Sequence, residues 1–128
     1  MQSLQVEGAR VWLLDSVTQG GPGQTGAVVV TGSHGGLSAA RYAAAYRPAL
    51  VVFNDAGVGK DAAGVAGLAW LERAGVAAVA VSAASARIGE AADTWSSGVI
   101  SHVNAPAAAL GFRVGERLQR AVERYLAG

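Results

Sequence analysis

The chain has 128 residues, the length of about one domain, and combines 52% hydrophobic residues with only 15% charged residues. This composition predicts one packed domain over residues 1–128 and excludes disorder driven by charge. The net charge of +1 is spread over scattered residues, which argues against nucleic acid as a partner, and zero cysteines exclude disulfides, thiolate catalysis and cysteine-bound zinc.

The first half of the chain predicts strands that are followed by loops or a helix. Residues 4–14 are rich in apolar side chains and predict one or two strands. A Gly-rich loop over 18–26 follows, of the kind that borders functional sites. Residues 27–30 and 49–53 are short apolar runs, typical of strands covered on both faces. The Ala-rich residues 37–46 between them predict a helix.

The second half repeats this alternation. Residues 62–74 predict a helix that ends before a glycine, and residues 76–81 predict another doubly covered strand. Weaker patterns predict a helix around 85–94 and a strand over 99–103, where a serine and a histidine interrupt the apolar residues. Residues 107–126 carry an apolar stripe at helical spacing and predict a final helix.

Alternating strands and helices with doubly covered strands predict the fold class. We expect an α/β domain built as a three-layer α/β/α sandwich, with a mostly parallel sheet of four or five strands. Its layout would be flavodoxin-like or Rossmann-like. In such open sheets, ligands bind outside the carboxyl ends of the strands, so polar residues that follow the strands are the candidates for function.

The segment TGSHGG follows the second of these strands. Ser33 between small residues resembles the layout of a nucleophile elbow, although Thr31 stands where the strict G-x-S-x-G pattern requires glycine. The amides of Gly35 and Gly36 at a helix start suit a second role, the binding of a phosphate or carboxylate. His34 would then act as acid, base or hydrogen-bond donor beside that anion.

The segment NDAGVGKDAAG follows the third strand and is the richest in polar residues. It departs from a P-loop at two positions, because Asn54 stands where glycine is required and Asp61 where serine or threonine is required. Asp61 is explained as a helix cap. Asp55 has no such local role and is predicted to act as general base or nucleophile, or to orient His34. Lys60 would neutralise a substrate anion, and Asn54 is a further candidate for substrate binding.

The loop after the fourth strand adds Ser82, Ser85 and Arg87 as substrate-binding candidates. Arginine grips carboxylates and phosphates through two hydrogen bonds, so Arg87 would complete the anion site. Alternatively, the serines cap a weak helix and the arginine is solvated. His102, inside an apolar run, is interpreted first as a partly buried structural residue. No metal is assigned, since no metal-ligand spacing is present.

These residues favour a small enzyme over other classes. We expect a hydrolase, lyase or isomerase that acts on a small anionic metabolite, with His34, Asp55 and Ser33 as catalytic residues and no cofactor. The alternative is a non-catalytic regulatory module that binds a nucleotide or phosphate. No apolar run approaches the roughly 18 residues of a membrane span, and no signal peptide is recognised, so a cytoplasmic location without membrane partners is expected. The apolar content also predicts self-association into a homo-oligomer.

Overall fold

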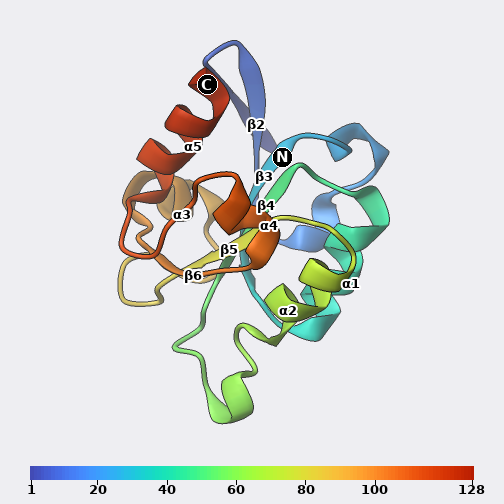
Figure 1. Cartoon of the computed structure of the whole chain (residues 1–128), viewed down its shortest axis with the longest axis vertical. Coiled ribbons are helices and arrows are strands. Elements are labelled where there is room, and N and C mark those ends of the chain that lie inside the picture. The colour runs from blue at the N-terminus through green and yellow to red at the C-terminus, as the bar shows by residue number, and fades with distance from the viewer.

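A computed structural model describes residues 1–128 as one six-stranded sheet with helices on both faces (Figure 1). The strands are β1 (Gln2–Val6), β2 (Ala9–Leu14), β3 (Val28–His34), β4 (Leu50–Asn54), β5 (Ala78–Val81) and β6 (Ile100–Val103). The helices are α1 (Leu37–Tyr46), α2 (Ala66–Arg73), α3 (Ala91–Ser97), α4 (Ala105–Ala109) and α5 (Leu118–Ala127). Short 3-10 turns are η1 (Val17–Gln19), η2 (Pro22–Gln24) and η3 (Lys60–Ala62).

The strands lie in the sheet in the same order as in the chain. β2 to β5 run parallel, whereas the edge strands β1 and β6 each pair antiparallel with their neighbour. An α/β fold with a mostly parallel sheet is therefore confirmed, but the sheet has six strands instead of four or five. Flavodoxin and Rossmann sheets reverse their strand order part-way and bind ligands at that point. This sheet has no such reversal.

The core divides into two clusters, one on each face of the sheet. Successive strand residues point to opposite faces, so Val30 and Val52 join one cluster while Val29 and Val51 join the other. The first cluster includes residues of α3 and α5, and the second includes residues of α1 and α2. Both faces are thus covered, which explains why the central strands have no polar alternation.

Some helices differ from the sequence-based expectation. The helix expected over 62–74 begins only at Ala66, because Asp61 and Ala62 have left-handed φ values of 56° and 57° that interrupt a right-handed helix. Asp61 is therefore not the cap of this helix, whose first residue follows Val65. The helix expected around 85–94 lies instead at Ala91–Ser97.

The last expected helix is divided into α4 and α5. Gly111 and Gly115 between them have φ values of 97° and 94°, a left-handed conformation that ends a right-handed helix. Buried Phe112 anchors the connecting segment in the core. No helix of the chain has the length and apolar character needed to span a bilayer.

Candidate functional site

Asp55, Ser101 and His102 form a chain of hydrogen bonds at the carboxyl end of β4. Asp55 directly follows the strand and is buried, with 6% of its surface exposed. The Ser101 hydroxyl donates to Asp55 Oδ2 at 2.8 Å. His102 Nδ1 lies 3.0 Å from the same hydroxyl oxygen. A carboxylate, a hydroxyl and an imidazole are thus linked in series.

The directions of these hydrogen bonds determine which histidine nitrogen carries the proton. A hydroxyl has one proton to donate, and an ionised carboxylate can only accept. Since Ser101 donates to Asp55, its oxygen accepts from His102, and Nδ1 therefore bears the hydrogen. The lone pair of Nε2 is left without a protein partner on a half-buried side chain. Such a nitrogen can accept a proton from a substrate and return it.

Backbone pairing brings these residues together from distant parts of the chain. β6 runs antiparallel to β5, with His102 opposite Ala80, and this places Ser101 beside the end of β4. Asp55 is held in turn by its other carboxylate oxygen, which accepts hydrogen bonds from the amides of Gly57 at 2.8 Å and Ala83 at 2.9 Å. The carboxylate therefore joins the ends of β4, β5 and β6.

These contacts also set the protonation state of Asp55. Burial acts to raise the pKa of its carboxyl group. The hydrogen bonds from Gly57, Ala83 and Ser101 and the nearby His102 outweigh burial, so the pKa lies below the ordinary value of 3.8. Asp55 is ionised at neutral pH and is an acceptor rather than a proton donor.

The lowered pKa of Asp55 predicts that its contribution to stability depends on pH. Ionised Asp55 stabilises the folded protein above about pH 4, where the unfolded carboxyl is also ionised, and this contribution is lost as the pH falls through the folded pKa. We expect Asp55→Asn to lower the free energy of unfolding by about 1–2 kcal/mol at neutral pH. Urea unfolding of both proteins at several pH values measures this difference, which should shrink in acid; a constant difference would contradict the assignment.

Gly35 and Gly36 serve packing in this structure. Both are buried, and the Gly35 N–H donates to the Asn54 carbonyl at 3.1 Å, so it is not available to an anion. The Gly67 N–H of α2 donates to the Gly35 carbonyl at 2.8 Å. A Cβ atom on Gly67 would lie only 2.4 Å from the Gly36 carbonyl oxygen. These glycines let α2 approach the start of α1 closely, and of the two amides expected to bind an anion, that of Gly35 is already engaged.

Ser33 and His34 lie within β3, not in the turn expected after it. The Ser33 hydroxyl accepts a hydrogen bond from the Val17 amide at 2.9 Å, which attaches η1 to the sheet. His34 is exposed, and its ring occupies the space beside Gly36. Both residues line a small pocket of about 160 Å³, but no hydrogen bond joins His34 to Asp55. The expected His34–Asp55 pair is therefore not formed.

Asn54, one of the candidates for substrate binding, has a structural role. It is fully buried, donates to the Ala86 carbonyl at 2.9 Å and accepts from the Ala56 amide at 2.8 Å. The Ser82 hydroxyl donates to the Ser85 hydroxyl at 2.9 Å. The Ser85 hydroxyl oxygen also accepts from the backbone amide of Val99, just before β6, at 2.9 Å. These hydroxyls stabilise the loop after β5.

The two cationic candidates are exposed. Arg87 lies 3.9 Å from Glu90 in a surface ion pair, while Lys60 at the start of η3 makes no ion pair. No hydrogen bond joins Arg87 or Lys60 to Gly35 or Gly36, and an anion site shared by the four loops stays a prediction. No three His, Asp or Glu side chains gather into a group that could hold a metal ion.

No protein-family model, curated protein or solved structure matches the chain. The assignment of function therefore rests on the geometry of the Asp55–Ser101–His102 chain.

Of the three residues in this candidate site, sequence reasoning singled out Asp55 but neither Ser101 nor His102. The available signal was the pair of polar residues that interrupts the apolar run of β6. In an otherwise apolar strand, two neighbouring polar side chains require partners, since buried polar groups without hydrogen bonds are costly.

Proposed function

We propose that the chain is a small enzyme of the hydrolase, lyase or isomerase type, with His102 as the general acid and base. Its substrate is a small anionic metabolite held at the carboxyl edge of the sheet. The observation that carries this proposal is the 3.0 Å contact between His102 Nδ1 and Ser101, which leaves Nε2 as the proton acceptor. A fixed tautomer with an open Nε2 is what a catalytic imidazole requires.

Asp55 and Ser101 support proton transfer as positioning residues. When Nε2 takes a proton from the substrate, the imidazole becomes positively charged. The ionised carboxylate of Asp55 stabilises that charge, and the 2.8 Å and 3.0 Å hydrogen bonds through Ser101 hold the ring in one orientation. Because two backbone amides fix Asp55, the Asp55–Ser101–His102 chain is already arranged before substrate binds.

The loop after β4 supports the anionic nature of the substrate. Residues 55–64 extend from the body of the molecule at the lower end of Figure 1 and carry exposed Lys60. Lys60 forms no ion pair, and its ammonium group can attract an anion toward the edge at which Asp55 lies. Gly57 and Gly59 have positive φ values and allow the loop its irregular path.

A substrate panel monitored by proton NMR in D2O tests this proposal. Small carboxylates and phosphate esters are incubated with the protein, and proton-to-deuterium exchange, isomerisation or new products reveal each of the three reaction types. For a converted substrate, we expect Ser101→Ala to lower kcat about tenfold through loss of orientation, with a small change in KM. Nitrogen NMR should show Nδ1–H in the wild type and a tautomer mixture in Ser101→Ala.

Ser96→Ala, on an exposed serine of α3, is the matched control and should retain wild-type kcat and the Nδ1–H signal. No conversion of any panel member, or wild-type turnover in Ser101→Ala with an unchanged tautomer, would contradict the proposal.

A further inference from the structure

β1 is an edge strand with no backbone partner on its outer side. It pairs only with β2, and no other segment forms a backbone hydrogen bond with it. The start of β6, at the other edge of the sheet, is covered, because residues 115–118 pair with residues 98–100 through hydrogen bonds of 2.8–2.9 Å. The sequence QSLQV of β1 contains no charge and no proline, and its pairing contains no bulge. These are the features that normally keep an edge strand from pairing with another chain.

The turn after β1 determines which of its backbone groups face outward. Residues 7–8 both have positive φ values, 50° and 79°, as in the two-residue turns that join antiparallel strands. In such a turn the C=O of Val6 faces the N–H of Ala9. Pairs that exchange hydrogen bonds alternate with pairs that do not in an antiparallel ladder, so the N–H and C=O groups of Ser3 and Gln5 point away from β2.

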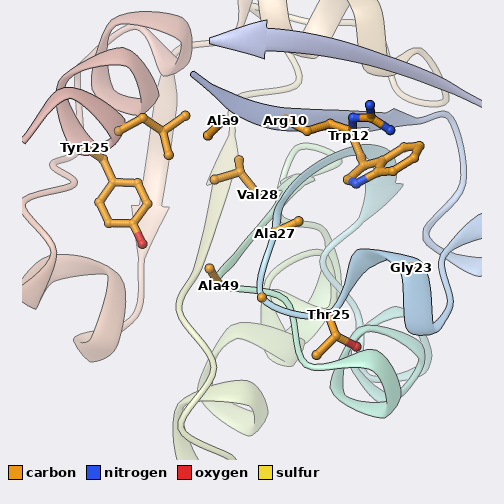
Figure 2. Close-up of a pocket in the computed structure, with 11 residues that line it drawn as sticks. Ala9, Arg10, Trp12, Gly23, Thr25, Ala27, Val28, Ala49 and Tyr125 are labelled. Atoms are coloured by element: carbon orange, nitrogen blue, oxygen red, sulfur yellow. The ribbon is translucent and has the colours of Figure 1, made fainter. Parts of the chain in front are cut away.

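Leu4 and Val6 give this edge an apolar face. Both side chains point to the face of the sheet that the first core cluster covers, and both are only half-buried. α5 lies beside the hairpin on the same face. Its Tyr125 packs against that cluster and lines one cavity together with Ala9, the partner of Val6, as Figure 2 shows. The edge therefore offers apolar side chains as well as unpaired backbone groups.

We propose that β1 pairs antiparallel with β1 of a second copy of the chain about a two-fold axis, which joins the two six-stranded sheets into one. Ser3 then lies opposite Gln5 of the second copy, and each such pair exchanges two backbone hydrogen bonds. This register pairs all five residues of β1 and brings the two Leu4 side chains together at the axis. The inference is independent of the proposed function, because Ser101 and His102 lie on β6 at the opposite edge.

The strand is complementary to itself in this register. Gln2 lies opposite Val6, Ser3 opposite Gln5 and Leu4 opposite Leu4, so no pair brings like charges together. The axis is perpendicular to the sheet, and α5 of each copy therefore lies on the same face, at opposite ends of the paired strands. Leu4 and Val6 of both copies form one apolar strip between these helices. The dimer thus covers side chains that are half-exposed in a single copy.

Sedimentation velocity of the full chain, from about 5 μM to about 1 mM, tests the inference. We expect a monomer–dimer equilibrium with a dissociation constant of about 100 μM or below. Amide hydrogen exchange measured by NMR at both ends of this concentration range locates the contact. Exchange at Ser3 and Gln5 should slow about fourfold or more at the higher concentration, because their amides are bonded only in the dimer. Amides of the central strand β4 should exchange at the same rate at both concentrations.

Two substitutions of Ser3 separate backbone pairing from other effects. Ser3→Pro removes an outward N–H and leaves the hydrogen bonds to β2 in place, so it should weaken dimerisation about tenfold or more. Ser3→Ala is the matched control, because it loses the same hydroxyl but keeps the amide, and it should dimerise like the wild type.

Three results would overturn the inference. The first is a wild type that stays monomeric at about 1 mM, which would leave the β1 edge to a different protein. The second is unaltered dimerisation of Ser3→Pro, which would place the contact on another surface. The third is exchange at Ser3 and Gln5 that does not change with concentration. The exchange comparison uses the wild type alone, so it decides the matter even if Ser3→Pro fails to fold.

Discussion

Replacing His102 by glutamine is expected to lower turnover about a hundred- to ten-thousand-fold while the protein stays folded. Glutamine can still hydrogen-bond Ser101, but its amide cannot take up and release a proton near neutral pH. His102 is only half-buried on an edge strand, so the substitution leaves little unsatisfied. The measurement is kcat for a substrate found in the NMR panel, compared with the wild type at equal folded concentration.

His34→Gln is the matched control for this experiment, because His34 is the other histidine of the chain and lies at the end of β3. It should retain wild-type kcat if His102 carries the proton. The opposite result, with turnover lost in His34→Gln and kept in His102→Gln, would move the chemistry to the small pocket that Ser33 and His34 line.

Replacing Asn104 by alanine is expected to lower the free energy of unfolding by about 3–5 kcal/mol. Its side chain is buried with 4% exposure and makes four hydrogen bonds. The amide group donates to the carbonyls of Leu68 at 3.2 Å and Val76 at 2.9 Å, and its oxygen accepts from the amides of Ala78 at 3.0 Å and Ala107 at 3.1 Å. Alanine would leave these backbone groups without partners.

Urea unfolding monitored by circular dichroism measures this loss. Gln119→Ala, which removes an amide of similar size from α5 where it has no hydrogen-bond partner in the protein, should change the free energy of unfolding by less than about 0.5 kcal/mol. A loss below about 1 kcal/mol in Asn104→Ala would show that water replaces the side chain, and that α2, β5 and α4 do not depend on it.

The sequence could predict the elements whose signal is local. β4 and β5 were found from apolar runs because strands covered on both faces need no polar residue, and α1 was found with its observed bounds because its Ala-rich segment ends before a proline. β6 was found as a strand, but its antiparallel direction was not, since nothing in a short run reveals which neighbour it pairs with.

The site was predictable only in part for the same reason. Asp55 stood out as a carboxylate that directly follows a buried strand. Its partner Ser101 lies 46 residues further along the chain, and only the return of the chain in β6 brings the two together. His34 was nearer in the expected sheet and was chosen instead. Gly35 and Gly36 matched an anion-binding pattern, but the same residues also satisfy the close contact with Gly67, and sequence spacing does not separate these two uses.

The chain-ordered sheet has a consequence for how the protein forms during synthesis. Every strand pairs with the strand made just before it, so the sheet can grow one strand at a time as the polypeptide leaves the ribosome, without waiting for a distant segment. The Asp55–Ser101–His102 chain is different, because its two halves lie on β6 and at the end of β4. A nascent chain therefore pairs β1 to β5 before β6 adds Ser101 and His102, and the hydrogen bonds to Asp55 form only when the last strand of the sheet is in place.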